Sequence, residues 1–136
     1  MNISNQILEW LKKCPYIGDI SSFDVNLLQA KDDSVALFKQ PSVTVQEFID
    51  GSKQVTEYYY FLFNKAAQIK TERLANEEYL RKIEDWVEEQ EFNGSYPDIG
   101  YPVDAIGMSN GYYMISYEDN EAKYQLTLGI QYRKEI

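Results

Sequence analysis

The sequence predicts an α+β fold in which a largely antiparallel mixed sheet is packed on one face by two helices. Two segments carry apolar residues at helical spacing, and most other apolar segments alternate with polar residues as strands do. Short turn signals join neighbouring strand segments, which favours hairpins and gives no βαβ pattern in the middle of the chain. The length of 136 residues fits a single domain, residues 1–136.

The first helix is expected at residues 3–13. Its apolar stripe consists of Ile3, Ile7, Leu8, Leu11 and Cys14, with Trp10 beside it. Lys12 and Lys13 suit the negative end of the helix dipole, and Pro15 ends the helix.

Strand segments are expected at residues 23–27, 43–49 and 54–63. Between the first two lies a shorter apolar stretch, residues 34–39, which ends at Pro41, and the pattern leaves the fold of residues 32–41 open. The last two are expected to pair as a hairpin, because Asp50-Gly51 between them favours a tight turn.

The second helix is the clearest element, with the sequence NEEYLRKIEDWVEEQEFNG. Asn76 is the expected N-cap, and Asn93-Gly94 is the expected end. The apolar stripe of this helix consists of Tyr79, Leu80, Ile83, Trp86 and Val87. An irregular loop follows at residues 93–102. Two further hairpin turns are then expected, at Asn110-Gly111 and at residues 118–121, which gives five to seven strands in all.

Residue types that carry out catalysis or hold metals are scarce. The chain has no histidine and one cysteine, Cys14, which we interpret as a small buried hydrophobe. The glycines form no nucleotide-binding motif. The acidic pairs Asp32-Asp33 and Glu118-Asp119, with Glu121 nearby, are typical of turns and lack calcium-loop spacing. We therefore expect a protein that is not an enzyme, with no catalytic, cofactor-binding or metal-binding residue.

Charge and targeting signals limit the partners and the location. The formal net charge is −9, and a strongly acidic chain repels nucleic-acid phosphates. The single cysteine fits a reducing compartment, and the N-terminus has no signal-peptide pattern. No segment has the roughly 20 apolar residues of a spanning helix, so no membrane association is expected.

Two features exceed what a generic globular domain needs. Acidic residues, among them Glu84, Glu88 and Glu89, crowd the C-terminal half of the second helix. They form a solvated face, a surface that faces a basic partner, or a surface kept acidic to repel DNA. The strand containing EYYYFLFNK is aromatic on both faces. One face carries Val55, Tyr59, Phe61 and Phe63, and the other carries Tyr58, Tyr60 and Leu62.

One of these two strand faces can pack on the helices. The other is covered either by a loop such as Tyr96–Tyr101 or by another subunit, because Tyr and Met are enriched in interface cores. The candidate interface residues are Tyr58, Tyr60, Leu62, Tyr112, Met114, Glu84, Glu88 and Glu89.

Several segments resemble a family of small proteins from tailed phages and prophages of Gram-positive bacteria. They are WLKKCPY (10–16), DGS (50–52) with the aromatic strand after it, DWVEEQ (85–90), and SNGY (109–112) through EAKYQ (121–125). Members of this family are described as minor capsid or tail-terminator-like proteins. The resemblance covers nearly the whole chain in order, and it carries over no catalytic residue.

The resemblance implies a structural role in the virion. Tail terminators are small α+β proteins that form a ring, usually six-fold, on the tail tube. Such a protein would contact copies of itself, the tail tube and the head-connector proteins, and DNA would pass without specific binding. It would be present in the host cytoplasm during assembly and then in the virion. Two alternatives remain at this point: a monomeric intracellular interaction module that binds a partner through its aromatic sheet face, and a small Mg²⁺-dependent hydrolase.

Overall fold

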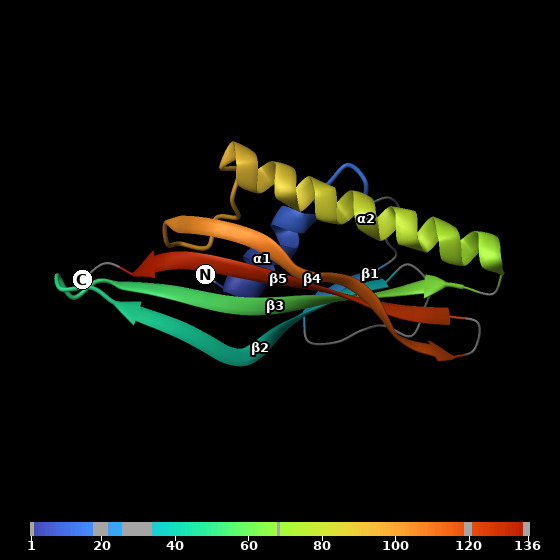
Figure 1. The fold of residues 1–136 in the computed structure, drawn as a ribbon, viewed down its shortest axis with the longest axis horizontal. Coiled ribbons are helices and arrows are strands. Elements are labelled where there is room, and N and C mark those ends of the chain that lie inside the picture. Colours follow the sequence, from blue (N-terminus) through green and yellow to red (C-terminus); the bar gives the residue numbers. More distant parts are fainter. Residues whose placement is uncertain (1, 18–21, 26–33, 68, 119–120, 135–136) are drawn as a thin grey trace.

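The computed structural model describes residues 2–17, 22–25, 34–67, 69–118 and 121–134, and only the backbone of residues 22–25, 42 and 109–113. The described residues form two helices and one five-stranded sheet, which confirms the α+β class (Figure 1). The elements in chain order are α1 (Ile3–Leu11), β1 (Ser22–Val25), β2 (Ser34–Glu47), β3 (Lys53–Ala66), α2 (Lys70–Asn93), β4 (Val103–Glu118) and β5 (Glu121–Lys134).

The sheet has the strand order β1-β2-β3-β5-β4. β1 is parallel to β2, and the other three pairs are antiparallel. The predicted hairpins β2–β3 and β4–β5 are both present. Because β5 lies between β3 and β4, those two strands run in the same direction, and β3–α2–β4 is a split parallel crossover. The expectation of no βαβ unit was therefore wrong; the last strand folds back between the two parallel strands.

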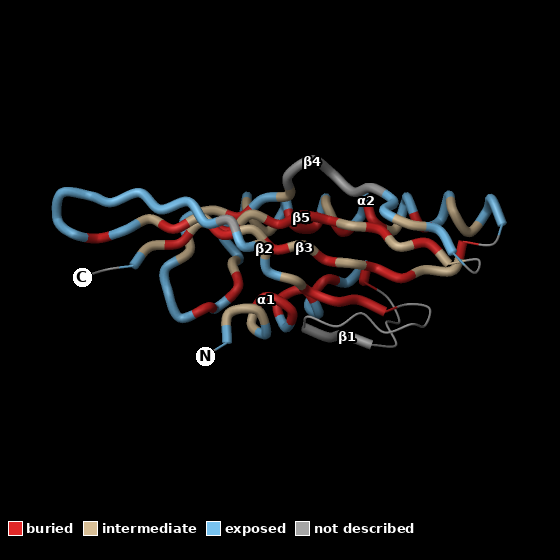
Figure 2. Tube along the Cα trace, turned by 90° about the horizontal axis from the view of Figure 1, so that it is seen from below, coloured by how far each residue is buried: buried red, intermediate tan, exposed pale blue. Residues whose placement is uncertain are grey.

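Both helices lie on one face of the sheet, with α1 near β1 and β2 and α2 along β4 and β3 (Figures 1 and 2). They meet at Trp10 and Trp86, whose ring centroids are 4.8 Å apart. The predicted apolar stripes of both helices are buried or pack against the core. The core therefore lies between a single helical layer and one face of the sheet.

Helix α2 begins earlier than the sequence pattern predicted. It starts at Lys70, and the side chain of Glu72 accepts a hydrogen bond from the N–H of Ile69. Asn76 is inside the helix and buried, and its Nδ2 donates to the carbonyl of Ala66 (2.9 Å) and to the hydroxyl of Tyr124 (3.4 Å). The N-cap prediction was wrong because this asparagine satisfies groups of β3 and β5. The predicted end is confirmed, with Gly94 at φ +69°.

Two predicted interruptions are bulges within long strands. Asn110-Gly111 lies inside β4, where the register with β5 shifts between Ser109 and Tyr113, so the predicted turn there was wrong. β2 continues through Pro41, with a register shift between Lys39 and Val43. In each case a long neighbouring strand supplies partners on both sides of the irregularity, and a bulge accommodates the extra residues.

Candidate interaction surfaces

The aromatic strand β3 presents two different faces. Its odd-numbered residues from Val55 to Phe63 are buried toward the helices, whereas the even-numbered residues from Gln54 to Leu62 are partly exposed. The candidate residues Tyr58, Tyr60 and Leu62 belong to the second set. They lie on the face of the sheet opposite the described helices, which we call the open face.

Uncharged side chains dominate the centre of the open face. The ring of Tyr60 stacks on Phe38 of β2 at 5.5 Å between centroids. Tyr58 pairs with Gly129 of β5, where an added Cβ would lie 3.2 Å from the tyrosine ring, so the glycine makes room for that ring. Thr127, on the same strand as Gly129, pairs with Tyr60. This arrangement gives a flat aromatic and polar surface.

The loop after α2 does not lie on the open face. Tyr101 stacks on Tyr132, whose side chain is buried on the helix side of β5, with ring centroids 5.1 Å apart. Tyr96 packs against the core and donates to the carbonyl of Asp104 at 3.4 Å. The interpretation that Tyr96–Tyr101 covers Tyr58 and Tyr60 is therefore wrong. The side chains of the loop tyrosines contact the helix side of the sheet.

The two remaining sheet candidates, Tyr112 and Met114, both belong to the edge strand β4. Met114 on the edge strand β4 is 44% exposed and pairs with Tyr124, a core residue, so the ladder places Met114 on the helix side. The side chain of Tyr112 lies outside the described residues. Met114 is thus not brought together with Tyr58 and Tyr60 in one patch.

Two of the three acidic candidates, Glu84 and Glu88, line a groove between α2 and β4. Glu89 is exposed on the same helix and is not among the described lining residues. The groove has a volume of about 360 Å³. The described residues that line it are Glu84, Asp85, Glu88, Glu91, Ile106, Gly107 and Met108. Glu91 also accepts a 2.7 Å hydrogen bond from the N–H of Ile106, which fixes the start of β4 against the helix.

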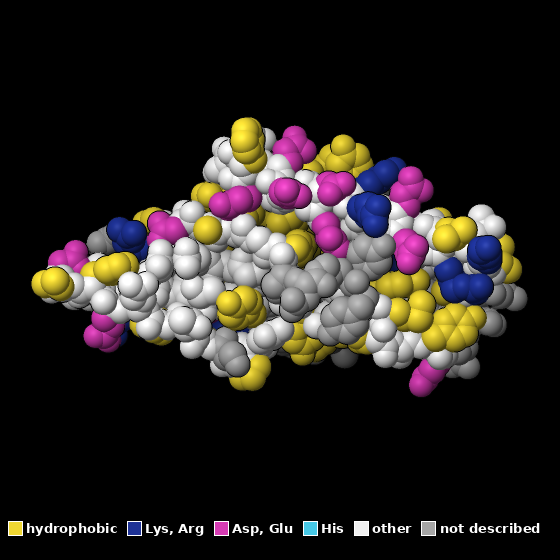
Figure 3. All heavy atoms as spheres, in the orientation of Figure 1, with side chains coloured by type: hydrophobic (Ala, Val, Ile, Leu, Met, Phe, Trp, Pro, Cys, Tyr) yellow, Lys and Arg dark blue, Asp and Glu magenta, His cyan; other side chains and the backbone are white. Residues whose placement is uncertain are grey.

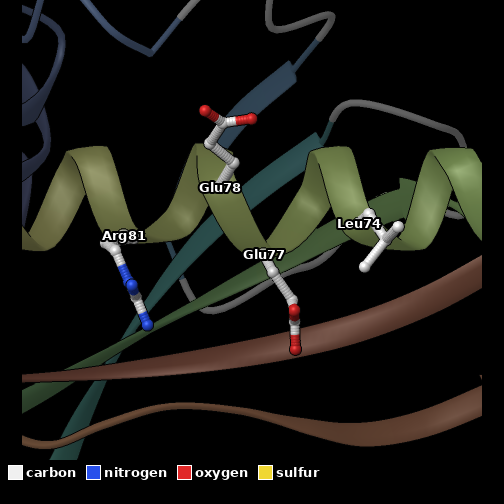
Figure 4. A pocket seen from close by; sticks show the side chains of 4 residues that line it. All are labelled: Leu74, Glu77, Glu78 and Arg81. Atoms are coloured by element: carbon white, nitrogen blue, oxygen red, sulfur yellow. The ribbon is translucent and has the colours of Figure 1, made fainter.

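A second hollow lies along α2. Its described lining is Leu74, Glu77, Glu78 and Arg81, and its volume is about 350 Å³. Figure 4 shows the side chains of Glu77 and Arg81, one helical turn apart, extending to the same side of the helix. This hollow is formed on α2, away from the open face of the sheet.

The structure reveals a surface that the sequence reasoning missed. The β2–β3 hairpin continues well past the helices at one end of the molecule (Figure 1). We call residues 43–55 the hairpin arm. Hydrophobic side chains lie beside acidic and basic ones at this end of the molecule (Figure 3). Exposed hydrophobic residues of the arm are Val43 (42%), Val45 (51%), Phe48 (36%) and Ile49 (109%).

The arm has an ordered tip and an open edge. The carboxylate of Asp50 accepts hydrogen bonds from the N–H (2.9 Å) and hydroxyl (2.6 Å) of Ser52, which lowers the pKa of Asp50, and Gly51 has φ +90°. β1 pairs with β2 only from Ser34 to Leu37, so the outer edge of β2 along the arm has no strand partner among the described residues. The alternation Val43-Thr44-Val45 and Asp50-Gly51 predicted the hairpin, but not that it extends beyond the helices.

A buried carboxylate lies at the base of the arm. Glu57 is 7% exposed and lies on the helix side of β3. Its Oε2 accepts a 2.7 Å hydrogen bond from Tyr59, and its Oε1 accepts a 2.6 Å hydrogen bond from Tyr132. The ammonium group of Lys39 lies 3.8 Å from Oε1. We call these four residues the Glu57 cluster.

Because of the Glu57 cluster, we expect the free energy of unfolding to fall at alkaline pH. Burial, and then the hydrogen bond to Glu57, raise the pKa values of Tyr59 and Tyr132 above the usual 10. The unfolded chain loses these protons from about pH 10 upward, whereas the folded chain keeps them, so stability is complete below pH 10 and falls above it. Each tyrosine should contribute a slope of about 1.4 kcal/mol per pH unit.

Denaturant unfolding measured between pH 8 and pH 11.5 tests this prediction. In Tyr132→Phe the free energy of unfolding should fall less steeply with rising pH, because one of the two titrating groups is gone. Identical slopes in the wild type and in this variant would contradict it.

None of the described helices has the length and apolarity needed to cross a membrane. No group of three or more described Cys, Asp and Glu side chains is arranged to hold a metal ion. Glu118 and Glu121 face each other across β4 and β5, while Asp32, Asp33 and Asp119 lie outside the described residues.

Neither a comparison with protein-family models nor one with curated protein sequences finds a match to the chain. The class that the fold defines is an α+β domain with one helical layer, one open sheet face and a projecting hairpin arm.

Proposed function

We propose that this chain is a structural virion assembly protein, a tail terminator or head–tail joining component that forms a ring capping a phage tail tube. The proposal rests on the resemblance of residues 10–16, 50–63, 85–90 and 109–125 to that family. The single observation that supports it best is the hairpin arm, which carries exposed valines on the edge strand β2 and an exposed isoleucine, Ile49, in the turn at its tip.

A projecting arm with apolar side chains suits contacts between identical copies. When one surface of a subunit binds a different surface of the next, repetition closes a ring if the rotation between copies allows it. The arm lies at one end of the molecule and could reach a neighbouring copy, and the open face with Tyr58 and Tyr60 offers further contact area. The proposed partners are copies of this chain, the tail tube and the head-connector proteins.

The acidic half of α2 suits a lumen through which DNA passes without binding. A basic surface would hold DNA through release of counterions, whereas an acidic one repels it. The triple variant Glu84→Gln, Glu88→Gln, Glu89→Gln should therefore slow DNA ejection or impair head–tail joining while leaving the amount of folded protein unchanged. Normal joining and ejection by phage carrying this variant would rule out the acidic lining.

Electron microscopy of tails assembled with and without the protein tests the central proposal. Tails of uncontrolled length in its absence, and tails of defined length after the purified protein is added back, are the expected results. Tails of defined length in the absence of the protein would contradict the terminator role.

A monomeric intracellular interaction module is the second candidate. The open edge of β2 favours it, because an extended peptide can add to such an edge through backbone hydrogen bonds. A single saturable peptide site on a protein that stays monomeric in the presence of tail tubes would favour this candidate. Ring-shaped particles on the tubes would favour the first.

A further inference from the structure

Glu57 lies at a buried position of β3 where an apolar side chain would need no hydrogen-bond partners. The neighbouring helix-side residues of β3 are Val55, Tyr59 and Phe61, all of which are buried. A buried carboxylate loses its hydration, and well-packed hydrophobic side chains often replace such groups without loss of stability. The presence of Glu57 therefore calls for a role other than net stabilisation.

The partners of Glu57 come from three adjacent strands. Lys39 lies on β2, Tyr59 on β3 and Tyr132 on β5. Both carboxylate oxygens accept a short hydrogen bond, so a specific alignment of β3 and β5 is required to satisfy the group. The ring of Tyr101 stacks on Tyr132, which is buried.

The apolar pattern does not by itself fix this alignment. A slip of one residue would turn every side chain to the wrong face, but a slip of two residues keeps each side chain on its own face. On the open face, the hydrogen bond from Gln131 to Thr56 (3.3 Å) and the fit of the Tyr58 ring over Gly129 favour the same register as Glu57 does, and a two-residue slip would remove them as well. Such a slip would move Tyr132 by about 6.7 Å along β5 and leave Glu57 buried without that donor.

We infer that Glu57 is a register lock: its buried carboxylate holds β3 and β5 in one alignment at the base of the hairpin arm and so fixes the direction in which the arm projects. Glu57 is a positioning residue for the arm. The inference concerns the arm of the isolated chain and holds whether or not the chain forms a ring.

Disulfide trapping in Glu57→Leu tests the lock. The cysteine pair Thr56→Cys with Gln131→Cys reports the native register, because these residues are direct partners. The pairs Thr56→Cys with Gly129→Cys and Thr56→Cys with Arg133→Cys report slips of two residues in either direction. In the wild-type background the native pair should oxidise fastest. In Glu57→Leu at least one slipped pair should oxidise on the order of tenfold faster than it does in the wild-type background.

Amide hydrogen exchange provides an independent readout. Glu57→Leu should keep a cooperative melting transition and wild-type protection in α2, while amides of the arm exchange on the order of tenfold faster. Glu47→Leu is the matched control, since that carboxylate is on the same arm with its side chain 71% exposed, and it should leave exchange unchanged. Wild-type exchange in the arm together with native-only trapping in Glu57→Leu would overturn the inference.

Tyr132→Phe keeps the inference testable if Glu57→Leu does not fold. The phenylalanine ring retains the stack on Tyr101 but removes one hydrogen bond to Glu57. Faster exchange confined to the arm supports the lock. Equal acceleration in the arm and in α2, or no acceleration, would show that Glu57 only contributes to overall stability or does not act on the arm.

Discussion

Replacing Trp86 with alanine is expected to lower the free energy of unfolding by about 3–5 kcal/mol. Trp86 is buried, and its ring contacts Trp10 at 4.8 Å between centroids. The substitution would leave a cavity between the two helices, which relax only partly around it. The Nε1 of Trp10 donates to the carbonyl of Ser95 at 3.0 Å, so the same cavity would loosen the loop that follows α2.

Thermal and denaturant unfolding measure this effect. For a chain of this size the melting temperature should fall by roughly 10–20 °C. Phe92→Ala is the matched control, because Phe92 lies on the same helix but is 90% exposed, and it should change stability by less than about 0.5 kcal/mol. Equal losses in the two variants would contradict the assignment of Trp86 to the helix–helix contact.

Replacing Ile49 with aspartate is expected to weaken strongly the self-association that the proposed ring requires. The side chain of Ile49 is fully exposed at the tip of the arm, so folding of the monomer does not depend on it. An ionised carboxylate in an apolar contact must be desolvated without a partner. We expect the dissociation constant between copies to rise by roughly 30-fold or more, the loss associated with an interface hot spot of about 2 kcal/mol.

Mass photometry with and without tail tubes measures the association. Leu74→Asp is the control, because Leu74 is 54% exposed on α2 and away from the arm, and it should assemble like the wild type. Assembly by Ile49→Asp at wild-type concentrations would show that the tip is not a contact between copies. Loss of assembly by both variants would point to a general effect of added negative charge on a chain whose net charge is already −9.

The local elements were largely predictable because their signals are local. Helical spacing identified the apolar stripes of α1 and α2, and Gly94 marked the end of α2 because a positive φ favours glycine. Asp50-Gly51 predicted the β2–β3 turn for the same reason. The errors came at Asn76, Pro41 and Asn110-Gly111, where residues typical of caps, breaks and turns lie within a longer helix or strand.

The candidate surfaces were less predictable. Sequence parity separated Tyr58, Tyr60 and Leu62 from the other face of β3, but it could not say which face the helices cover. Glu57 belongs to the buried set, and nothing in its sequence neighbours indicates that Tyr132, 75 residues away, donates to it.

The amino-acid sequence by itself determined the α+β class, the two amphipathic helices, the hairpins and the acidic balance, because each depends on neighbouring residues or on composition. Only the tertiary structure decided the strand order, the open face, the projection of the arm and the burial of Glu57. These features depend on contacts between residues far apart in the chain, since the insertion of β5 between β3 and β4 sets which surfaces the two helices cover and which remain exposed.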